Sequence, residues 1–88
     1  MLTKDFLIVN KLGLHARASA LFVKTASRFA SEVKLARDGI EVNGKSIMGI
    51  MMLAASKGTT VSLTLEGADE AEALQAIGEM ITNGFGEE

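Results

Sequence analysis

The sequence predicts an α+β fold, a two-layer open-faced sandwich in which helices cover one face of a four-stranded antiparallel sheet. Four segments show strand patterns that each offer one apolar face, and two longer segments have the amphipathic spacing of helices. A sheet with a single apolar face has to bury that face under another layer. With 88 residues and 48% hydrophobic side chains, we expect one domain, residues 1–88, in the order β-α-β-β-α-β-α.

The N-terminal part of the chain predicts a strand followed by a helix. Residues 2–9 form the strand, and their apolar run favours a central position in the sheet. Residues 16–30 form the helix, because apolar side chains recur there at helical spacing while Lys24 and Arg28 mark the opposite side. The apolar positions of this helix are Phe22, Val23, Ala26, Phe29 and Ala30.

A β-hairpin is predicted next. Segments 32–37 and 40–43 alternate between apolar and polar residues, and the Asp38-Gly39 pair between them is typical of two-residue hairpin turns. The hairpin side chains expected to face the core are Val33, Leu35, Ile40 and Val42.

The C-terminal part predicts a strand and a last helix. Residues 60–66 alternate without exception, with hydroxyl side chains on one face. Asp69 and Glu72 have the spacing of a capping box at the helix start. The apolar stripe of the helix consists of Leu74, Ile77, Ile81 and Phe85. The acidic segment 66–88 is expected to be a solvated helix face without a function of its own.

Composition excludes several classes of function. The chain has no cysteine and one histidine, so we expect no disulfide, no metal site and no cofactor. Residues 1–57 hold nine basic residues and four acidic ones, whereas residues 58–88 hold seven acidic residues and no basic one. A net charge of -2 and four aromatic residues, all Phe, argue against nucleic-acid binding. No apolar run is long enough for membrane insertion and no signal-peptide pattern is present, so we expect a cytoplasmic location. We also expect a monomer.

His15 and Arg17 stand where the start of a helix usually carries acidic or hydroxyl side chains. A cation at this end of the helix dipole is unfavourable by about 0.3–1 kcal/mol unless an anion completes the site. The backbone N–H groups of Ala16, Arg17 and Ala18, with the Arg17 guanidinium, would converge on a phosphoryl group. Gly13 gives the preceding loop its conformational freedom. The pattern therefore predicts a phosphate site.

His15 is the candidate phosphoryl acceptor, because imidazole is a nucleophile near neutral pH and can hold the group as a labile N–P adduct. Alternatives are a regulatory domain that binds an anionic metabolite without covalent chemistry, an acyl-phosphate hydrolase, and a histidine that merely caps or packs. A hydrolase would lack its general base, since no paired carboxylate or second histidine stands near His15 in an obvious constellation. We favour a phosphoryl carrier, whose partners supply the remaining groups.

The chain resembles the HPr family of phosphocarrier proteins of the bacterial phosphotransferase system over essentially its whole length. Gly-Leu-His-Ala-Arg at 13–17 matches the active-site motif of the family, and Asn-Gly-Lys-Ser-Ile-Met at 43–48 falls at its regulatory serine site. The resemblance implies four antiparallel strands backed by helices. It also implies that His15 is phosphorylated on Nδ1 by phospho-enzyme I, charged from phosphoenolpyruvate, and passes the group to an enzyme IIA.

The chain departs from the family pattern at Ala18, where members usually carry Pro. Proline would fix φ in the first turn of the helix, whereas alanine is compatible with the helix but leaves the site less constrained. Asn-Lys-Leu-Gly at 10–13 and Asn-Gly-Phe at 83–85 resemble the nitrogen-related branch of the family more than the sugar-transporting branch.

Ser46 is a favoured N-cap residue for a short apolar helix over residues 47–55, and a plain cap explains it fully. The resemblance implies a second role, because the serine at this position is phosphorylated by a dedicated kinase in some bacteria. A kinase or phosphorylase acting on Ser46 is therefore a candidate partner. Lys45 would pair with the added phosphate. Phospho-Ser46 is expected to hinder docking by placing charge beside an apolar surface rather than by unfolding the helix.

The short helix is apolar nearly all round, so part of it must be exposed unless the helix is buried more deeply than we suppose. With Ile50 and Leu53 in the core, a surface patch remains that consists of Ile47, Met48 and Met51. Flexible methionine side chains suit a surface that meets several partners. Ala20, Lys24 and Arg17 would lie beside it, giving an apolar centre with a basic rim for acidic partners.

Overall fold

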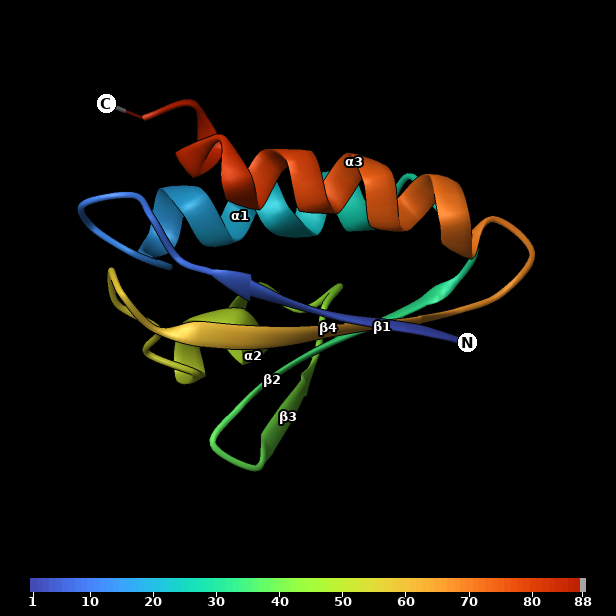
Figure 1. The fold of residues 1–88 in the computed structure, drawn as a ribbon, viewed down its shortest axis with the longest axis horizontal. Coiled ribbons are helices and arrows are strands. Elements are labelled where there is room, and N and C mark those ends of the chain that lie inside the picture. Colours follow the sequence, from blue (N-terminus) through green and yellow to red (C-terminus); the bar gives the residue numbers. More distant parts are fainter. Residues whose placement is uncertain (88) are drawn as a thin grey trace.

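The computed structural model describes residues 1–87 and shows one four-stranded antiparallel sheet with three helices, in the predicted order. The spatial order of the strands is β1-β4-β2-β3 (Figure 1). The elements are β1 (Leu2–Leu7), α1 (Ala16–Ala26), β2 (Glu32–Arg37), β3 (Ile40–Asn43), α2 (Ile47–Met52), β4 (Thr60–Glu66), α3 (Glu70–Thr82) and a final 3-10 turn, η1 (Gly84–Gly86). The predicted fold class is confirmed.

The core lies between the sheet and the helices. α1 and α3 lie side by side over one face of the sheet, and α2 packs against α1 and β3 (Figure 1). β4 contributes the alternate side chains that its pattern predicts, Val61, Leu63 and Leu65. The largest fully buried side chains include Phe22, Ile8, Leu35, Ile50, Ile77 and Ile81. Burial of each such side chain contributes about 1.5–3 kcal/mol, so this packing holds α1 firmly against the sheet.

β1 lies at an edge of the sheet, so the prediction of a central position is wrong. It pairs with β4 alone among the described strands, from Leu2 opposite Leu65 to Leu7 opposite Thr60. β4 takes a central position because β2 pairs with its other side. The apolar run misleads because Leu7 is 51% exposed, while its neighbours Phe6 and Ile8 are buried. Hydrophobicity reports the burial of a strand but not which neighbours it pairs with.

β2 and β3 form the predicted hairpin. Asp38 and Gly39 have φ values of 51° and 81°, the two positive values that a type I′ turn requires. Ile40 is 59% exposed, so its prediction as a core residue is wrong. The turn between β2 and β3 projects away from α1 and α3 (Figure 1), and Ile40 is the first residue of β3 after that turn. The other three predicted core side chains are buried or partly buried against the core: Val33, Leu35 and Val42.

α1 ends earlier than its apolar pattern predicts, because a distant carboxylate binds the backbone that follows. Asp69 accepts hydrogen bonds from the N–H of Ala30 at 2.8 Å and of Ser31 at 2.9 Å, and from the Ser31 hydroxyl. Phe29 still packs against the core from the turn after α1. Asp69 is the N-cap residue of α3, but its side chain makes no cap bond, so the predicted capping box with Glu72 is wrong.

Removing the Asp69 carboxylate should make folding less sensitive to acid. The Ser31 hydroxyl and the Ala30 N–H hold the pKa of Asp69 below its ordinary value of 3.8, against a smaller effect of desolvation. A pKa lowered by folding adds stability that is complete above 3.8 and is lost as the pH falls through the lower folded value. We expect Asp69→Asn to unfold at a lower urea concentration than the wild type at neutral pH. The difference should shrink as the pH falls to about 2.

Urea unfolding at a series of pH values measures this effect. Glu72→Gln removes a carboxylate from the exposed side of α3 and is the charge-matched control. A difference between wild type and Asp69→Asn that stays constant through the acid range would contradict the role given to this carboxylate.

Candidate functional site

A fixed loop between β1 and α1 positions His15. Gly13 has a φ of 63°, and a Cβ at this position would lie 2.4 Å from the carbonyl oxygen of Ala55, so only glycine fits without a shift. The N–H of Leu14, which is buried, donates to the same Ala55 oxygen at 2.9 Å. The Ser19 hydroxyl donates to the Leu14 oxygen at 3.1 Å. These contacts hold the backbone immediately before His15.

His15 is the N-cap residue of α1, with φ −73° and ψ 179°, but its side chain makes no cap bond. Its ring contacts a carboxylate instead, with Nε2 at 2.5 Å from Oε2 of Glu87. The side chain is 26% exposed, so the ring is held at the surface and not in the core. Within residues 1–87, Nδ1 makes no hydrogen bond. This arrangement argues against a histidine that merely caps or packs.

The first turn of α1 has the character of an anion site. It contains no acidic residue. The first helical hydrogen bond runs from the N–H of Ser19 to the oxygen of His15 at 2.8 Å, so the N–H groups of Ala16, Arg17 and Ala18 have no helical partner. Arg17 is exposed, whereas the Ala18 methyl is fully buried and packs α1 onto the core. The backbone groups and the guanidinium are therefore available to a phosphoryl group.

Glu87 belongs to the site, and the expectation that no carboxylate partners His15 is wrong. Its Oε1 accepts a hydrogen bond from Nδ2 of Asn10 at 3.1 Å. The bonds from Asn10 and His15 lower the pKa of Glu87, the nearby charges of His15 and Arg17 add to this, and desolvation opposes it. Since 72 residues separate Glu87 from His15, no local pattern relates them. The sequence indicates a contact between the two only through their charges, because Glu87 is acidic and all basic residues fall within residues 1–57.

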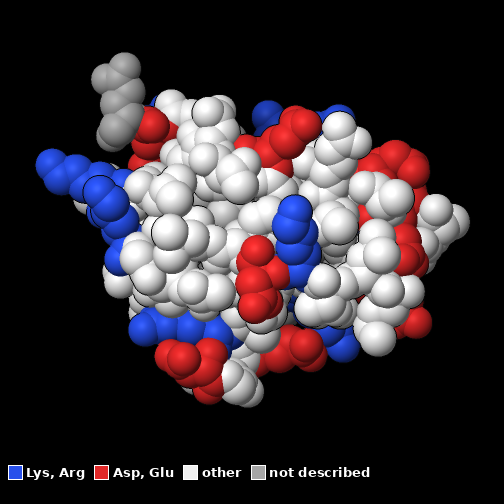
Figure 2. All heavy atoms as spheres, in the orientation of Figure 1, with Lys and Arg blue, Asp and Glu red and all other residues white. Residues whose placement is uncertain are grey.

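His15, Arg17 and Glu87 line one open hollow of about 380 Å³, together with Lys11 and Leu12. Figure 2 shows basic side chains projecting at the end of the molecule where the β1–α1 loop lies. Acidic side chains gather at the opposite end, near the turn from β4 to α3. The hollow combines imidazole, guanidinium and carboxylate groups. An open site of this size suits a small anionic group presented by another protein better than an enclosed substrate.

Ser46 is the N-cap residue of α2, as predicted, and its Oγ accepts a hydrogen bond from the N–H of Gly49 at 3.1 Å. It does not line the hollow around His15. The Lys45 ammonium group donates to the carbonyl oxygen of Phe29 at 2.7 Å. Lys45 would have to break this bond before it could form the predicted pair with a phosphate on Ser46.

The α1–α2 patch, defined as Ala20, Lys24, Ile47, Met48 and Met51, is at the surface. The exposed fractions of its three α2 side chains are 44% for Ile47, 72% for Met48 and 42% for Met51. Ile50 and Leu53 are buried, which confirms the prediction of the side of α2 that faces the core. The alternative, in which the whole helix is buried, is wrong. Ala20 and Lys24 are exposed on α1, which packs against α2. The use of this patch for docking stays a prediction.

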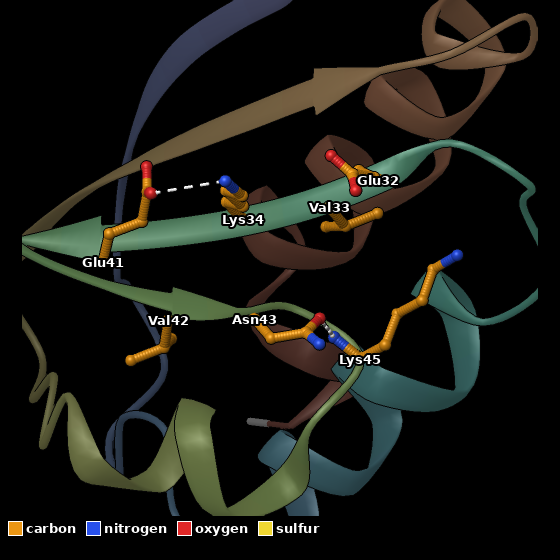
Figure 3. Close-up of a pocket in the computed structure, with 7 residues that line it drawn as sticks. All are labelled: Glu32, Val33, Lys34, Glu41, Val42, Asn43 and Lys45. Atoms are coloured by element: carbon orange, nitrogen blue, oxygen red, sulfur yellow. Dashed lines mark hydrogen bonds and ion pairs between the residues drawn. The ribbon is translucent and has the colours of Figure 1, made fainter.

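A second hollow, of about 390 Å³, lies along β2 and β3 (Figure 3). Inside it, Lys34 and Glu41 form an ion pair at 3.7 Å, and the Asn43 side-chain oxygen accepts from the Lys45 N–H at 2.9 Å. Lys34 and Glu41 thus neutralise each other, the Lys45 ammonium group is already bonded to Phe29, and the residues that line the hollow include no histidine, serine or cysteine. Among residues 1–87, no three His, Cys, Asp or Glu side chains gather as metal ligands would. That part of the chain also has no helix of the length and hydropathy that a membrane span needs.

Comparisons with known proteins agree with one another. The family model described as "PTS HPr component phosphorylation site" matches residues 2–83. A phosphocarrier protein HPr of Neisseria meningitidis serogroup A is 58% identical over 87 residues, which cover 99% of this chain and 98% of the relative. The solved structure of HPr-C-His from Thermoanaerobacter tengcongensis has a TM-score of 0.96 at 51% identity, covering 100% of this chain and 99% of that one. An HPr dimer from the same organism has a TM-score of 0.79 at 52% identity, with 93% and 94% covered.

Proposed function

The chain belongs to the HPr family of phosphocarriers of the bacterial phosphotransferase system, and we propose that His15 is the residue that carries the phosphoryl group. In this proposal, His15 accepts the group from phospho-enzyme I and passes it to an enzyme IIA. The comparisons favour this carrier role over a regulatory domain that only binds an anionic metabolite, because the family match and the relatives span nearly the whole chain.

The proposal is carried by a half-buried imidazole at the start of a helix without acidic residues in its first turn. The Nδ1 lone pair attacks phosphorus, and the bond between phosphorus and the donor breaks as the N–P bond forms. The phosphoryl oxygens then meet the N–H groups of Ala16, Arg17 and Ala18 and the Arg17 guanidinium. Nothing else in the hollow is a comparable nucleophile, since its other lining side chains are Lys11, Leu12, Arg17 and Glu87.

A carrier also has to keep its phosphoryl group until the next protein docks. Glu87, the one carboxylate that lines the hollow among residues 1–87, already accepts a hydrogen bond from Asn10 and contacts His15. It is therefore poorly placed to activate a water molecule against the phosphorus. This favours a carrier over an acyl-phosphate hydrolase, in which a free general base would be needed.

Incubation with enzyme I and phosphoenolpyruvate tests the proposal. Mass spectrometry should find one phosphoryl adduct, which is labile in acid and maps to His15. Reversible binding of phosphoenolpyruvate without an adduct would favour the regulatory domain, and an adduct on another residue would contradict the role of His15.

The α1–α2 patch supports a docking role in the same proposal. It combines exposed apolar side chains of α2 with Lys24, which is exposed on α1, the helix that packs against α2. Apolar centres with charged rims give rapid and reversible association, which a carrier needs with each partner. Ser46 heads α2 and is the proposed site of a regulatory kinase or phosphorylase. The cytoplasmic location, the monomeric state and the assignment to the nitrogen-related branch stay predictions.

Ser46→Asp should weaken docking without unfolding α2. The aspartate retains a cap acceptor for the N–H of Gly49, while it adds a charge beside the apolar patch. We expect the KM for this protein as a substrate of phospho-enzyme I to rise about tenfold, which corresponds to about 1.4 kcal/mol. Helix content, measured by circular dichroism, should not change. Ser46→Asn caps without a charge and is the control, so equal KM values for the two variants would refute the charge effect.

A further inference from the structure

We propose that Glu87 is a positioning residue that keeps the proton of His15 on Nε2 and so presents an unprotonated Nδ1 to the incoming phosphorus. The inference deepens the proposed function and rests on it, because it assumes that His15 is the acceptor. It assigns a role to a residue outside the 13–17 motif and outside the stretch that the family model matches, which ends at residue 83.

The geometry of the carboxylate fixes the donor and the acceptor of the contact. Oε2 of Glu87 lies 2.5 Å from Nε2 of His15, so a hydrogen atom lies between the imidazole nitrogen and the carboxylate oxygen. An ionised carboxylate can only accept, so Nε2 must supply the hydrogen. The lowered pKa of Glu87 keeps this carboxylate ionised at neutral pH. A neutral ring with its proton on Nε2 has its lone pair on Nδ1.

Asn10 holds the carboxylate in place from the opposite side. Its Nδ2 donates to Oε1 of Glu87 at 3.1 Å and to the carbonyl oxygen of Gly13 at 2.8 Å. Asn10 is only 4% exposed, so its amide is itself fixed by the surrounding protein. The two carboxylate oxygens are thus shared between a buried amide and the imidazole. A carboxylate held in this way orients a histidine ring as well as selecting its tautomer.

The C-terminal segment is folded so that Glu87 reaches the site. Phe85 is 6% exposed and has a φ of 58°, which turns the chain after α3 while its ring stays in the core. The N–H of Glu87 donates to the oxygen of Gly84 at 3.0 Å, and the N–H of Gly86 donates to that of Asn83 at 3.2 Å. The position of Glu87 therefore follows from a buried anchor and a hydrogen-bonded turn, and not from the contact with His15 alone.

The transfer step explains why a carboxylate at Nε2 helps. When the N–P bond forms at Nδ1, the ring keeps its Nε2 proton and gains a positive charge, while the donor takes back the electron pair of the bond that breaks. The negative charge of the Glu87 carboxylate, which lies next to Nε2, stabilises the positive charge of the ring as it develops. The step is reversible. When the group leaves, the electron pair of the N–P bond returns to Nδ1 and the ring becomes neutral again.

Glu87→Gln tests the inference, because the amide has nearly the same shape but no charge and can also donate to Nε2. At a pH where the ring is neutral, ¹⁵N NMR of the ring nitrogens should show more of the tautomer with hydrogen on Nδ1. The rate of transfer from saturating phospho-enzyme I should fall about tenfold. The concentration that gives half of that rate should not change, since Glu87 lies outside the α1–α2 patch. Glu72→Gln removes the same charge from α3 and should match the wild type.

The inference is overturned if the tautomer ratio of Glu87→Gln equals that of Glu72→Gln, or if its saturating rate does. A change only in the concentration that gives half of the saturating rate also overturns it, because that would make Glu87 a docking residue. Thermal unfolding midpoints that agree among the three proteins show that the rate loss is not a loss of fold. These outcomes are independent of the proposed function, which fails only if the wild type is not phosphorylated on His15.

Discussion

His15→Ala should abolish phosphoryl transfer through the protein. Alanine has no lone pair that can attack phosphorus, and the hollow offers no second nucleophile of comparable reactivity among the described residues. The loss should therefore be complete within the detection limit, unlike the graded effects expected at Glu87 and Ser46. The measurement is the rate of phosphoryl transfer from phospho-enzyme I to an enzyme IIA in the presence of wild-type or variant protein.

The fold of His15→Ala should remain intact, which makes a rate loss interpretable. The His15 side chain makes no cap bond and is 26% exposed, so its removal opens no cavity in the core. The backbone oxygen of residue 15 still accepts the first helical bond of α1. A matching thermal unfolding midpoint is the control for folding. Transfer at the wild-type rate would refute the central role of the imidazole.

Local patterns predicted most elements of the fold, because their causes lie within a few residues. Segment 60–66 forms β4 at the bounds that strict alternation gives, and the Asp38-Gly39 pair forms the turn that its preference for positive φ indicates. The errors arise where the cause is distant. The end of α1 depends on Asp69, which lies 39 residues from Ala30. The edge position of β1 depends on which strands occupy the two sides of β4.

The candidate site also contains some residues that local patterns predict and others that they do not. His15, Arg17 and the free N–H groups of α1 were predicted because a cation at a helix start conflicts with the local dipole, and this conflict is visible in five consecutive residues. Asn10 and Glu87 were missed. Their relation to His15 depends on how the C-terminal turn packs on the β1–α1 loop, and charge counting alone treats Glu87 as part of a solvated acidic segment.

The close approach of the β1–α1 loop to the segment after α2 is a further tertiary feature on which the site depends. Gly13 was predicted to give the loop freedom, but its role is more specific. It lets the loop backbone pass against Ala55 and Ser56, where a Cβ would lie 2.4 Å from the oxygen of Ala55 and 2.8 Å from Cα of Ser56. Both contacts are to backbone atoms, which cannot move aside as a side chain can. The same Ala55 oxygen accepts the N–H of Leu14, next to His15.

Gly13→Ala should therefore reduce both stability and transfer. The positive φ of 63° and the overlap with Ala55 together should lower the free energy of unfolding by about 2–4 kcal/mol. Relief of the overlap pushes the loop outward, breaks the Leu14 bond and displaces His15 relative to the N–H groups of α1. A shift of about 1 Å in a reacting group is enough to slow transfer about a hundredfold. Urea unfolding and the transfer rate at saturating phospho-enzyme I measure the two effects.

Gly58→Ala is the control that separates the effect of steric overlap from the effect of a positive φ. Gly58 also has a positive φ, 89°, but a Cβ there would meet no atom within 4 Å. We expect this variant to lose about 1 kcal/mol of stability from conformational strain and to transfer phosphate at the wild-type rate. If Gly13→Ala loses no more stability than Gly58→Ala and keeps its transfer rate, the contact with Ala55 does not position His15. If only Gly13→Ala is slow, the packing of this loop, and not its flexibility, places the imidazole.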